Sequence, residues 1–195
     1  MTFWDDNATP AGVFNVGDMY DEYTRRQADF IVEQLDITSG VLLDLGCGVG
    51  RLSAVVLDRL LPDVSVVGSD PSWPMLEKAQ QRIPGMRIED NISVFPELTF
   101  DGAWCVLTFQ HLPDDTVKQH LTDLFEILEP GARLVTQWVT TGQQAPMSYP
   151  RPFVSVVDMI KDIGFSVHGP SAVLPDDYVT RYADDWVWVV AEKPA

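Results

Sequence analysis

The feature that most constrains the fold is a short apolar run followed at once by closely spaced glycines. Residues 41–45 read VLLDL, and an apolar run of this length between turn residues is typical of a strand buried on both faces of a parallel sheet. Gly46, Gly48 and Gly50 follow at every second position. Glycines there let the backbone turn tightly and approach a ligand closely. Apolar residues at helical spacing come next, so we expect a strand-to-helix junction.

A second apolar run ends in an acid. Residues 64–69 read VSVVGS and Asp70 follows them. A strand, a glycine turn, a helix and a second strand with a carboxylate at its end form half of a nucleotide-binding sheet. The dinucleotide fingerprint requires glycine at its first, third and sixth positions. Counted from Gly46, the sixth position is Arg51, which disfavours an NAD-dependent enzyme.

The spacing Asp44-x-Gly46-x-Gly48-x-Gly50, with the later acid Asp70, resembles the class I S-adenosylmethionine (SAM) dependent methyltransferase family. The resemblance covers roughly residues 19–193. It implies an α/β three-layer sandwich with a seven-stranded, mostly parallel sheet. The implied strand order is 3-2-1-4-5-7-6, with strand 7 antiparallel and helices on both faces. It also implies SAM as cofactor and S-adenosylhomocysteine as product.

We expect the 195 residues to form one domain. Its parts would be an N-terminal arm over 1–18, a pocket-covering helix over 19–35 and a possible substrate loop over 140–152. The expected later strands are 86–88, 100–107, 132–139, 165–168 and 185–191. Asp114 or Asp115 is expected to cap the helix after the fourth strand, and residues 129–131, which read EPG, are expected to end it.

The resemblance also implies a set of residues around the cofactor. The matching positions are Asp44, Gly46, Cys47, Gly48, Gly50, Asp70, Pro71, Ser72, Asp90, Asn91, Ile92, Val106 and Leu107. In the family the glycine turn passes under the methionine part of SAM, and the acid that ends the second strand holds the ribose hydroxyls. An acid after the third strand, here Asp90, meets the adenine amino group.

The pocket-covering helix offers further candidates. The resemblance implies that Tyr20, Tyr23 and Arg25 are candidates to meet the carboxylate of SAM. The alternative stays open that both tyrosines belong to the core and that the arginine is solvated.

The acceptor side should lie after the fourth strand, because open α/β sheets bind ligands at the carboxyl ends of their strands. Thr108 and Gln110 follow that strand, and Trp138 and Tyr149 lie on the fifth strand and in the loop behind it. His111 is the candidate base, since imidazole titrates near neutral pH. Alternatively, His111 is a loop residue held by a neighbouring polar group. No metal is expected.

Composition excludes several partners. The formal net charge is −16, and the basic residues are scattered, whereas a nucleic-acid binder shows a basic patch. No apolar run has the length of a membrane helix. The two cysteines indicate free thiols in a reducing cytoplasm. We therefore expect a cytoplasmic monomer or homodimer that methylates a small molecule at O, N or C. The alternative is a non-catalytic SAM-binding protein or a partner subunit of a larger methyltransferase complex.

Overall fold

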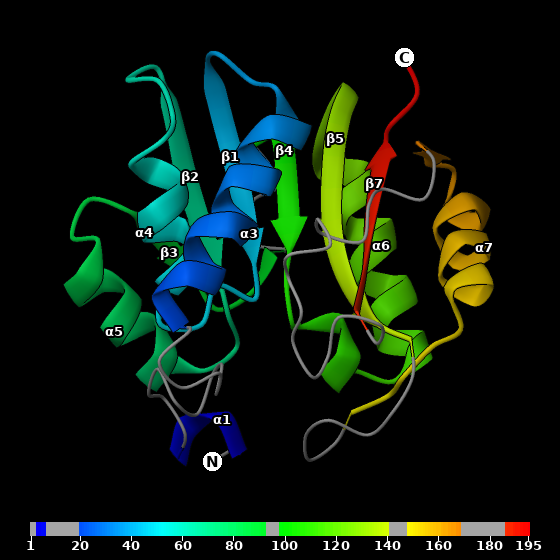
Figure 1. Cartoon of the computed structure of the whole chain (residues 1–195), viewed down its shortest axis with the longest axis horizontal. Coiled ribbons are helices and arrows are strands. Elements are labelled where there is room, and N and C mark those ends of the chain that lie inside the picture. Colours follow the sequence, from blue (N-terminus) through cyan, green and yellow to red (C-terminus); the bar gives the residue numbers. More distant parts are fainter. Residues whose placement is uncertain (1–2, 7–19, 93–97, 141–147, 169–185) are drawn as a thin grey trace.

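The computed structural model describes residues 3–6, 20–92, 98–140, 148–168 and 186–195. Within these ranges the strands form one sheet of order β3-β2-β1-β4-β5-β7-β6 (Figure 1). Neighbouring strands from β3 to β5 are parallel, and β7 is antiparallel to both β5 and β6. The expected sheet order and the reversed last strand are confirmed.

The strands and helices of the described residues have the following bounds, and short connections join the first of them. The strands are β1 (Gly40–Leu45), β2 (Val64–Ser69), β3 (Arg87–Glu89), β4 (Phe100–Cys105), β5 (Leu128–Val139), β6 (Ser166–Val167) and β7 (Trp186–Glu192). The helices are α1 (Phe3–Asp6), α3 (Tyr20–Leu35), α4 (Arg51–Leu57), α5 (Trp73–Arg82), the 3-10 helix η3 (Phe109–His111), α6 (Asp114–Ile127) and α7 (Phe153–Ile163).

Helices cover both faces of the sheet, as the three-layer expectation requires. Residues of α3, α4 and α5 pack with the sheet into one core cluster, and residues of α6 and α7 pack into another. Successive strand residues face opposite clusters: Leu42 contributes to the first and Leu43 to the second, and neither is exposed. This alternation explains why the strands read as unbroken apolar runs.

The fifth strand begins earlier than expected. β5 starts at Leu128 instead of Ala132, because Leu128 pairs with Phe100 and a register shift follows before Gly102. The EPG segment therefore lies inside the strand. Gly131 has φ 84° and its N–H donates to the Lys193 carbonyl at 2.7 Å.

The expected cap of α6 is also corrected. Pro113 holds the N-cap position, and Asp114 and Asp115 lie in the first turn of the helix. Acids in a first turn are favourable because they face the positive end of the helix dipole. Asp114 has a further use, as a partner of Arg151.

Other boundaries agree closely with the expectations. α3 spans nearly the whole expected helix, and Gly164 is the C-cap of α7. β4 ends at Cys105, two residues before the expected end at Leu107, and Leu107 has a positive φ of 60°. Most of the expected arm over 1–18 and the middle of the loop over 140–152 lie outside the described residues. No helix in the described ranges is both long and apolar enough to cross a bilayer.

Candidate functional site

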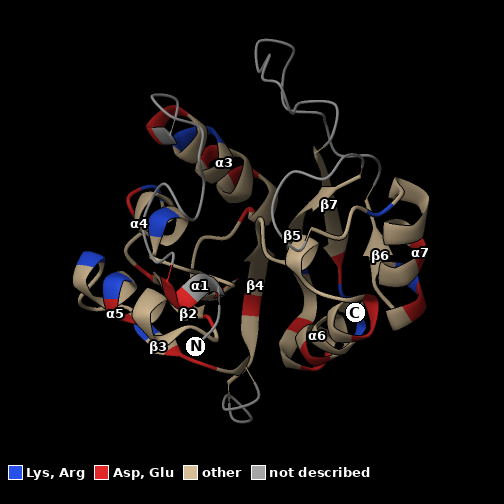
Figure 2. Ribbon diagram, turned by 90° about the horizontal axis from the view of Figure 1, so that it is seen from below, with Lys and Arg blue, Asp and Glu red and all other residues tan. Residues whose placement is uncertain are grey.

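A cleft opens at the carboxyl ends of β1, β2 and β4. Its volume is about 840 Å³ including the open mouth, within the usual range for small-ligand sites. Figure 2 looks onto this edge of the sheet, where α1 lies in front of β2. The residues around the cleft are Asp44, Gly46, Cys47, Gly48, Arg51, Leu52, Asp70, Pro71, Met75, Val106, Leu107, Thr108, His111 and Leu112.

The glycine turn after β1 forms the floor of the cleft. Gly46, Gly48 and Gly50 have φ of 78°, 53° and 69°, a left-handed conformation that glycine adopts without strain. Gly46 must also be small, because a Cβ there would lie 2.0 Å from the Thr108 Oγ1 atom. The N–H of Gly46 donates to the Ser69 carbonyl at 2.7 Å, so the turns after β1 and β2 are fastened together.

Asp70 joins the two turns through its side chain. One carboxylate oxygen accepts from the Gly48 N–H at 3.0 Å, and the other accepts from the Ser72 N–H at 2.9 Å. Burial raises the pKa of Asp70 despite these two hydrogen bonds, and the nearby Asp5 carboxylate raises it further. Asp5 lies in α1 and accepts a hydrogen bond from the Ser72 hydroxyl at 2.7 Å. A rigid carboxylate thus faces the cleft.

A second acid, Asp44, lies at the base of the cleft with 3% of its surface exposed. Burial raises its pKa to about 7, although the Ser53 hydroxyl donates to it and the Arg51 guanidinium is nearby. Arg51 was not among the expected site residues. Its position directly after the last glycine of the turn was the available signal, because the first residue of the following helix must face the same space.

The loop after β4 forms the opposite wall. Leu107 has the left-handed conformation, which is strained for a bulky side chain, and residues strained in this way cluster at active sites. Thr108 and His111 line the cleft, and the Nε2 atoms of Gln110 and His111 lie 3.0 Å apart. Gln110 itself is 8% exposed and is not among the residues that line the cleft.

A buried arginine holds this wall in place. The Nη1 atom of Arg151 donates to the Phe109 carbonyl at 3.0 Å, and Nη2 donates to the Leu112 carbonyl. These carbonyls lie at the two ends of the η3 segment. The Nε atom of Arg151 donates to the Asp114 carboxylate at 2.8 Å. Sequence reasoning missed Arg151, and a lone arginine between two prolines gives no signal of such a role.

Comparisons with known proteins agree with this geometry. A family model described as a methyltransferase domain matches residues 42–131. Demethylmenaquinone methyltransferase of Lactiplantibacillus plantarum is 34% identical over 103 residues, which are 48% of this chain and 43% of that protein. Trans-aconitate 2-methyltransferase of Methylobacterium radiotolerans is 34% identical over 119 residues, 60% of this chain and 45% of that protein. The chain thus spans less than half the length of these relatives.

The solved structures extend the likeness over the whole fold. Magnesium protoporphyrin IX methyltransferase of Synechocystis, with bound S-adenosylhomocysteine, has a TM-score of 0.71 at 16% identity and covers 94% of this chain and 91% of its own. A SAM-dependent methyltransferase of Leishmania major has a TM-score of 0.78 at 18% identity, with 97% and 79% covered.

The methyltransferase-domain match therefore covers residues 42–131, and the fold of the whole chain resembles that of solved SAM-dependent methyltransferases. Some of these solved proteins are described as SAM-dependent or as bound to S-adenosylhomocysteine. The cleft of this chain combines the Asp70 carboxylate, the glycine turn and an apolar wall of Val106 and Leu107.

Several other expected site residues lie outside the cleft lining. Gly50 packs on Ala79 behind the turn, Asp90 and Asn91 are exposed after β3, and Ile92 is 2% exposed in the core. No group of His, Cys, Asp or Glu suited to a metal occurs within the described ranges.

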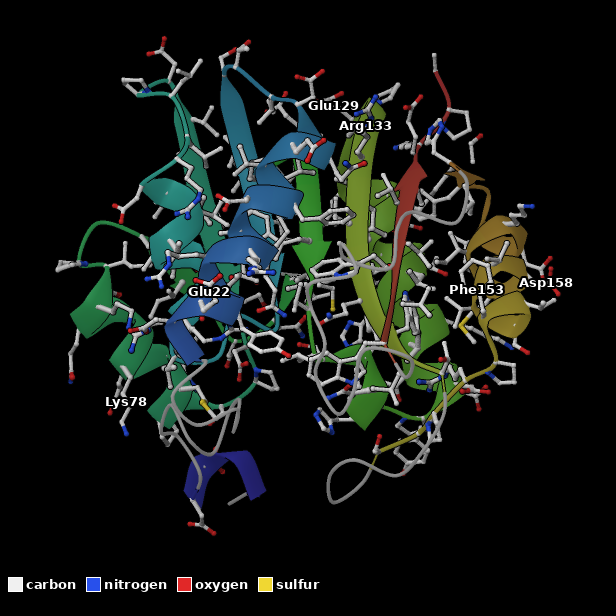
Figure 3. All side chains as sticks on the ribbon, viewed as in Figure 1. Glu22, Lys78, Glu129, Arg133, Phe153 and Asp158 are labelled. Carbon is white, nitrogen blue, oxygen red and sulfur yellow. The ribbon has the colours of Figure 1, made fainter. Side chains whose placement is uncertain are left out.

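Of the residues expected on α3, Arg25 and Tyr23 also lie outside the cleft lining. Arg25 pairs with Glu22 at 3.4 Å and its side chain is 54% exposed, and Figure 3 shows Glu22 on the outside of the helix. Tyr23 is 2% exposed, which matches the core alternative. The side chain of Tyr20 lies outside the described residues.

The aromatic residues expected on the acceptor side do not reach the cleft. Trp138 is 1% exposed and packs on Phe109 with ring centroids 5.0 Å apart, so the structure corrects its assignment to a core position. Tyr149 is 44% exposed. Its N–H donates to the Gln110 carbonyl at 2.7 Å, which links the segment before α7 to η3.

Proposed function

We propose that this chain transfers the methyl group of SAM to a small-molecule acceptor. The observation that carries the proposal is the Asp70 carboxylate, fixed by the N–H groups of Gly48 and Ser72 at the edge of the cleft. A carboxylate held in this way can accept hydrogen bonds from a vicinal diol, and bonds to charged groups are stronger than neutral ones.

The two walls of the cleft have separate roles in this proposal. The turn after β1, with Asp44 at its base, would hold the methionine part of the cofactor, and Pro71 would lie beside the adenosine. Thr108, His111 and Leu112 would face the acceptor. Alignment of the two reactants is the main requirement, because orientation alone can contribute about 7–11 kcal/mol to a displacement.

SAM supplies a methyl carbon on a sulfonium sulfur; the acceptor's lone pair forms the new bond, the sulfur keeps the old bonding pair, and S-adenosylhomocysteine is released. An acceptor hydroxyl or amine must also lose a proton. We propose His111 as the group that takes it. A neutral His111 that accepts from the Gln110 amide at Nε2 carries its proton on Nδ1. It therefore becomes a base only when this contact breaks.

The acceptor class rests on the relatives. Their names give demethylmenaquinone, trans-aconitate and magnesium protoporphyrin IX as acceptors, which differ in chemistry but are all small molecules. We propose the same class here, in a cytoplasmic monomer or homodimer that does not bind nucleic acid. A second candidate is a non-catalytic SAM-binding protein or a partner subunit whose acceptor site lies on another chain.

Two measurements on the purified chain separate these functions. Calorimetry with S-adenosylhomocysteine tests the cofactor site, and incubation with methyl-labelled SAM and a fractionated metabolite extract tests transfer. Saturable binding with label in a small product supports the enzyme. Binding without transfer supports the partner subunit, and the absence of binding would refute both.

A further inference from the structure

The positive charges of the described residues lie mostly away from the cleft. Of the described Lys and Arg residues, Arg51 alone lines the cleft. It donates to the Thr24 hydroxyl at 2.7 Å and to the Gln27 side-chain oxygen at 2.8 Å, and its charge acts to lower the pKa of the buried Asp44. Arg51 is therefore engaged by the interior of the protein before any acceptor enters.

The other cations have partners or positions outside the cleft. Arg151 binds the carbonyls of η3 and the Asp114 carboxylate. The remaining cations of the described ranges are exposed, or they pair with acids or backbone carbonyls elsewhere. In the sequence outside these ranges the basic residue is Arg181, and the acids there are Asp18, Glu97, Asp176, Asp177, Asp184 and Asp185.

Negative charge gathers at the cleft instead. Asp44 and Asp70 line it, and Asp5 of α1 lies at the same edge, where it accepts from the Ser72 hydroxyl. Burial raises the pKa of both lining acids, and repulsion adds to it, since Asp70 raises the pKa of Asp44 and Asp5 raises that of Asp70. An anionic acceptor would have to approach these acids and a chain of net charge −16.

The wall that would face the acceptor carries no ionic partner for it. Val106, Leu107 and Leu112 lie there beside the Thr108 hydroxyl and the His111 imidazole, and Leu112 also packs against the core cluster of α6 and α7. A charged group placed against these side chains would lose water without an opposite charge among them, which is costly. An uncharged hydroxyl can instead exchange hydrogen bonds with Thr108 and His111.

We propose that the acceptor is an uncharged, largely apolar molecule whose reacting hydroxyl or non-basic amine lies beside Thr108 and His111. This inference rests on the proposed function, because it names the substrate class of the same site. It excludes polycarboxylates such as trans-aconitate, the acceptor in the name of one relative. It also excludes protonated amines, because such an acceptor would bring a second positive charge against the sulfonium of the donor.

Fractionation by charge tests the inference before the acceptor is known. Aqueous and organic metabolite extracts are separated on anion- and cation-exchange resins at neutral pH, and each fraction is incubated with the purified chain and methyl-labelled SAM. The neutral fraction should give the most labelled product, and trans-aconitate alone should give none. More label from the anionic or the cationic fraction would overturn the inference and leave the proposed function standing. Label from no fraction would overturn transfer by this chain and the inference together.

Leu112→Lys tests the wall directly. It should lower the rate of transfer to the neutral fraction by about tenfold or more, because a charge would then lie against an apolar acceptor. The affinity for S-adenosylhomocysteine, measured by calorimetry, should stay close to that of the parent. Leu112→Met keeps the wall apolar at similar volume and should keep most of the transfer.

Leu61→Lys is the matched control. Leu61 is 52% exposed, lies between α4 and β2 and is not among the cleft residues, so its variant should behave like the parent. Circular dichroism checks that each variant is folded. Unchanged transfer in Leu112→Lys, or a loss of S-adenosylhomocysteine affinity as large as the loss of transfer, would overturn the inference.

Discussion

At the residue scale, Asp70 both connects two turns of the backbone and faces the proposed cofactor site. It fastens the turns after β1 and β2 through the N–H groups of Gly48 and Ser72, and it faces the cleft. Asp70→Ala should therefore weaken the binding of SAM by about tenfold or more, because hydrogen bonds to a charged group contribute about 1.5–3 kcal/mol each.

Calorimetry measures this loss, and circular dichroism checks that the variant is folded. Asp90→Ala is a useful companion, since Asp90 is exposed after β3. A much larger loss for Asp90→Ala than for Asp70→Ala would place the adenosine at a different strand end from the one proposed.

Asp44 gives the unliganded protein a pH dependence with a defined sign. Its pKa is raised from 3.8 to about 7 by burial, so the folded state binds this proton more tightly than the unfolded state. The resulting stability is fully present below the unfolded pKa and is lost as the pH rises toward 7. Asp44→Asn, which stays neutral and can still accept from Ser53, should remove this loss.

Denaturant unfolding at about pH 4 and about pH 8 measures the effect. Between these limits the variant should gain roughly 2–4 kcal/mol relative to the parent, since each unit of pKa shift corresponds to about 1.4 kcal/mol. Asp58→Asn, at the exposed end of α4, is the control. Parallel pH profiles for Asp44→Asn and the parent would contradict the prediction.

At the scale of elements, the loop after β4 depends on Arg151, which lies at the end of the connection between β5 and α7. Arg151 donates to carbonyls at both ends of η3. Arg151→Met leaves these carbonyls without that donor, and a buried polar group without a partner costs about 1–3 kcal/mol. We expect the free energy of unfolding to fall by about 2–4 kcal/mol and methyl transfer to fall further than SAM affinity.

Arg133→Met is the control. It shows how much stability is lost when an arginine that does not contact η3 is replaced. Arg133 donates to the Gln34 carbonyl and pairs with Glu192, and Figure 3 shows it at the end of β5 away from the cleft. This variant should lose about 1 kcal/mol or less, as partly exposed pairs do. Similar losses in both variants would mean that Arg151 does not hold the loop.

The elements also show what a sequence can and cannot predict. The glycine spacing and Asp70 identified the first half of the sheet, and the resemblance supplied the strand order. The predicted start of β5 was wrong. The EPG segment is locally a helix-ending signal, but the strand starts earlier because Leu128 pairs with Phe100. The role of Arg151 and the burial of Trp138 depend on contacts between segments that are far apart in the chain, which no local pattern records.

At the scale of the whole molecule, the charge of −16 should prevent binding to nucleic acid. In Figure 2 the basic residues of the described helices are spread over α3, α4, α5, α6 and α7 without forming one stripe. A phosphate backbone would therefore be repelled over most of the surface. Fluorescence anisotropy with labelled DNA and RNA duplexes at physiological salt should show no sub-micromolar binding by the isolated chain, and any such binding would contradict the prediction.

The two cores on opposite faces of the sheet have a consequence for how such a protein can change. Leu42 and Leu43 belong to different cores, so a one-residue insertion in β1 would exchange the faces of every following side chain and turn Asp44 away from its partners. The position of Asp44 in the proposed cofactor site therefore depends on how β1 packs into the two cores. Thr108, His111 and Leu112 lie beyond the end of β4, outside the sheet. Under the proposed function, new acceptors can accordingly be accommodated by replacing residues after a strand, while the strands that would hold the donor stay as they are.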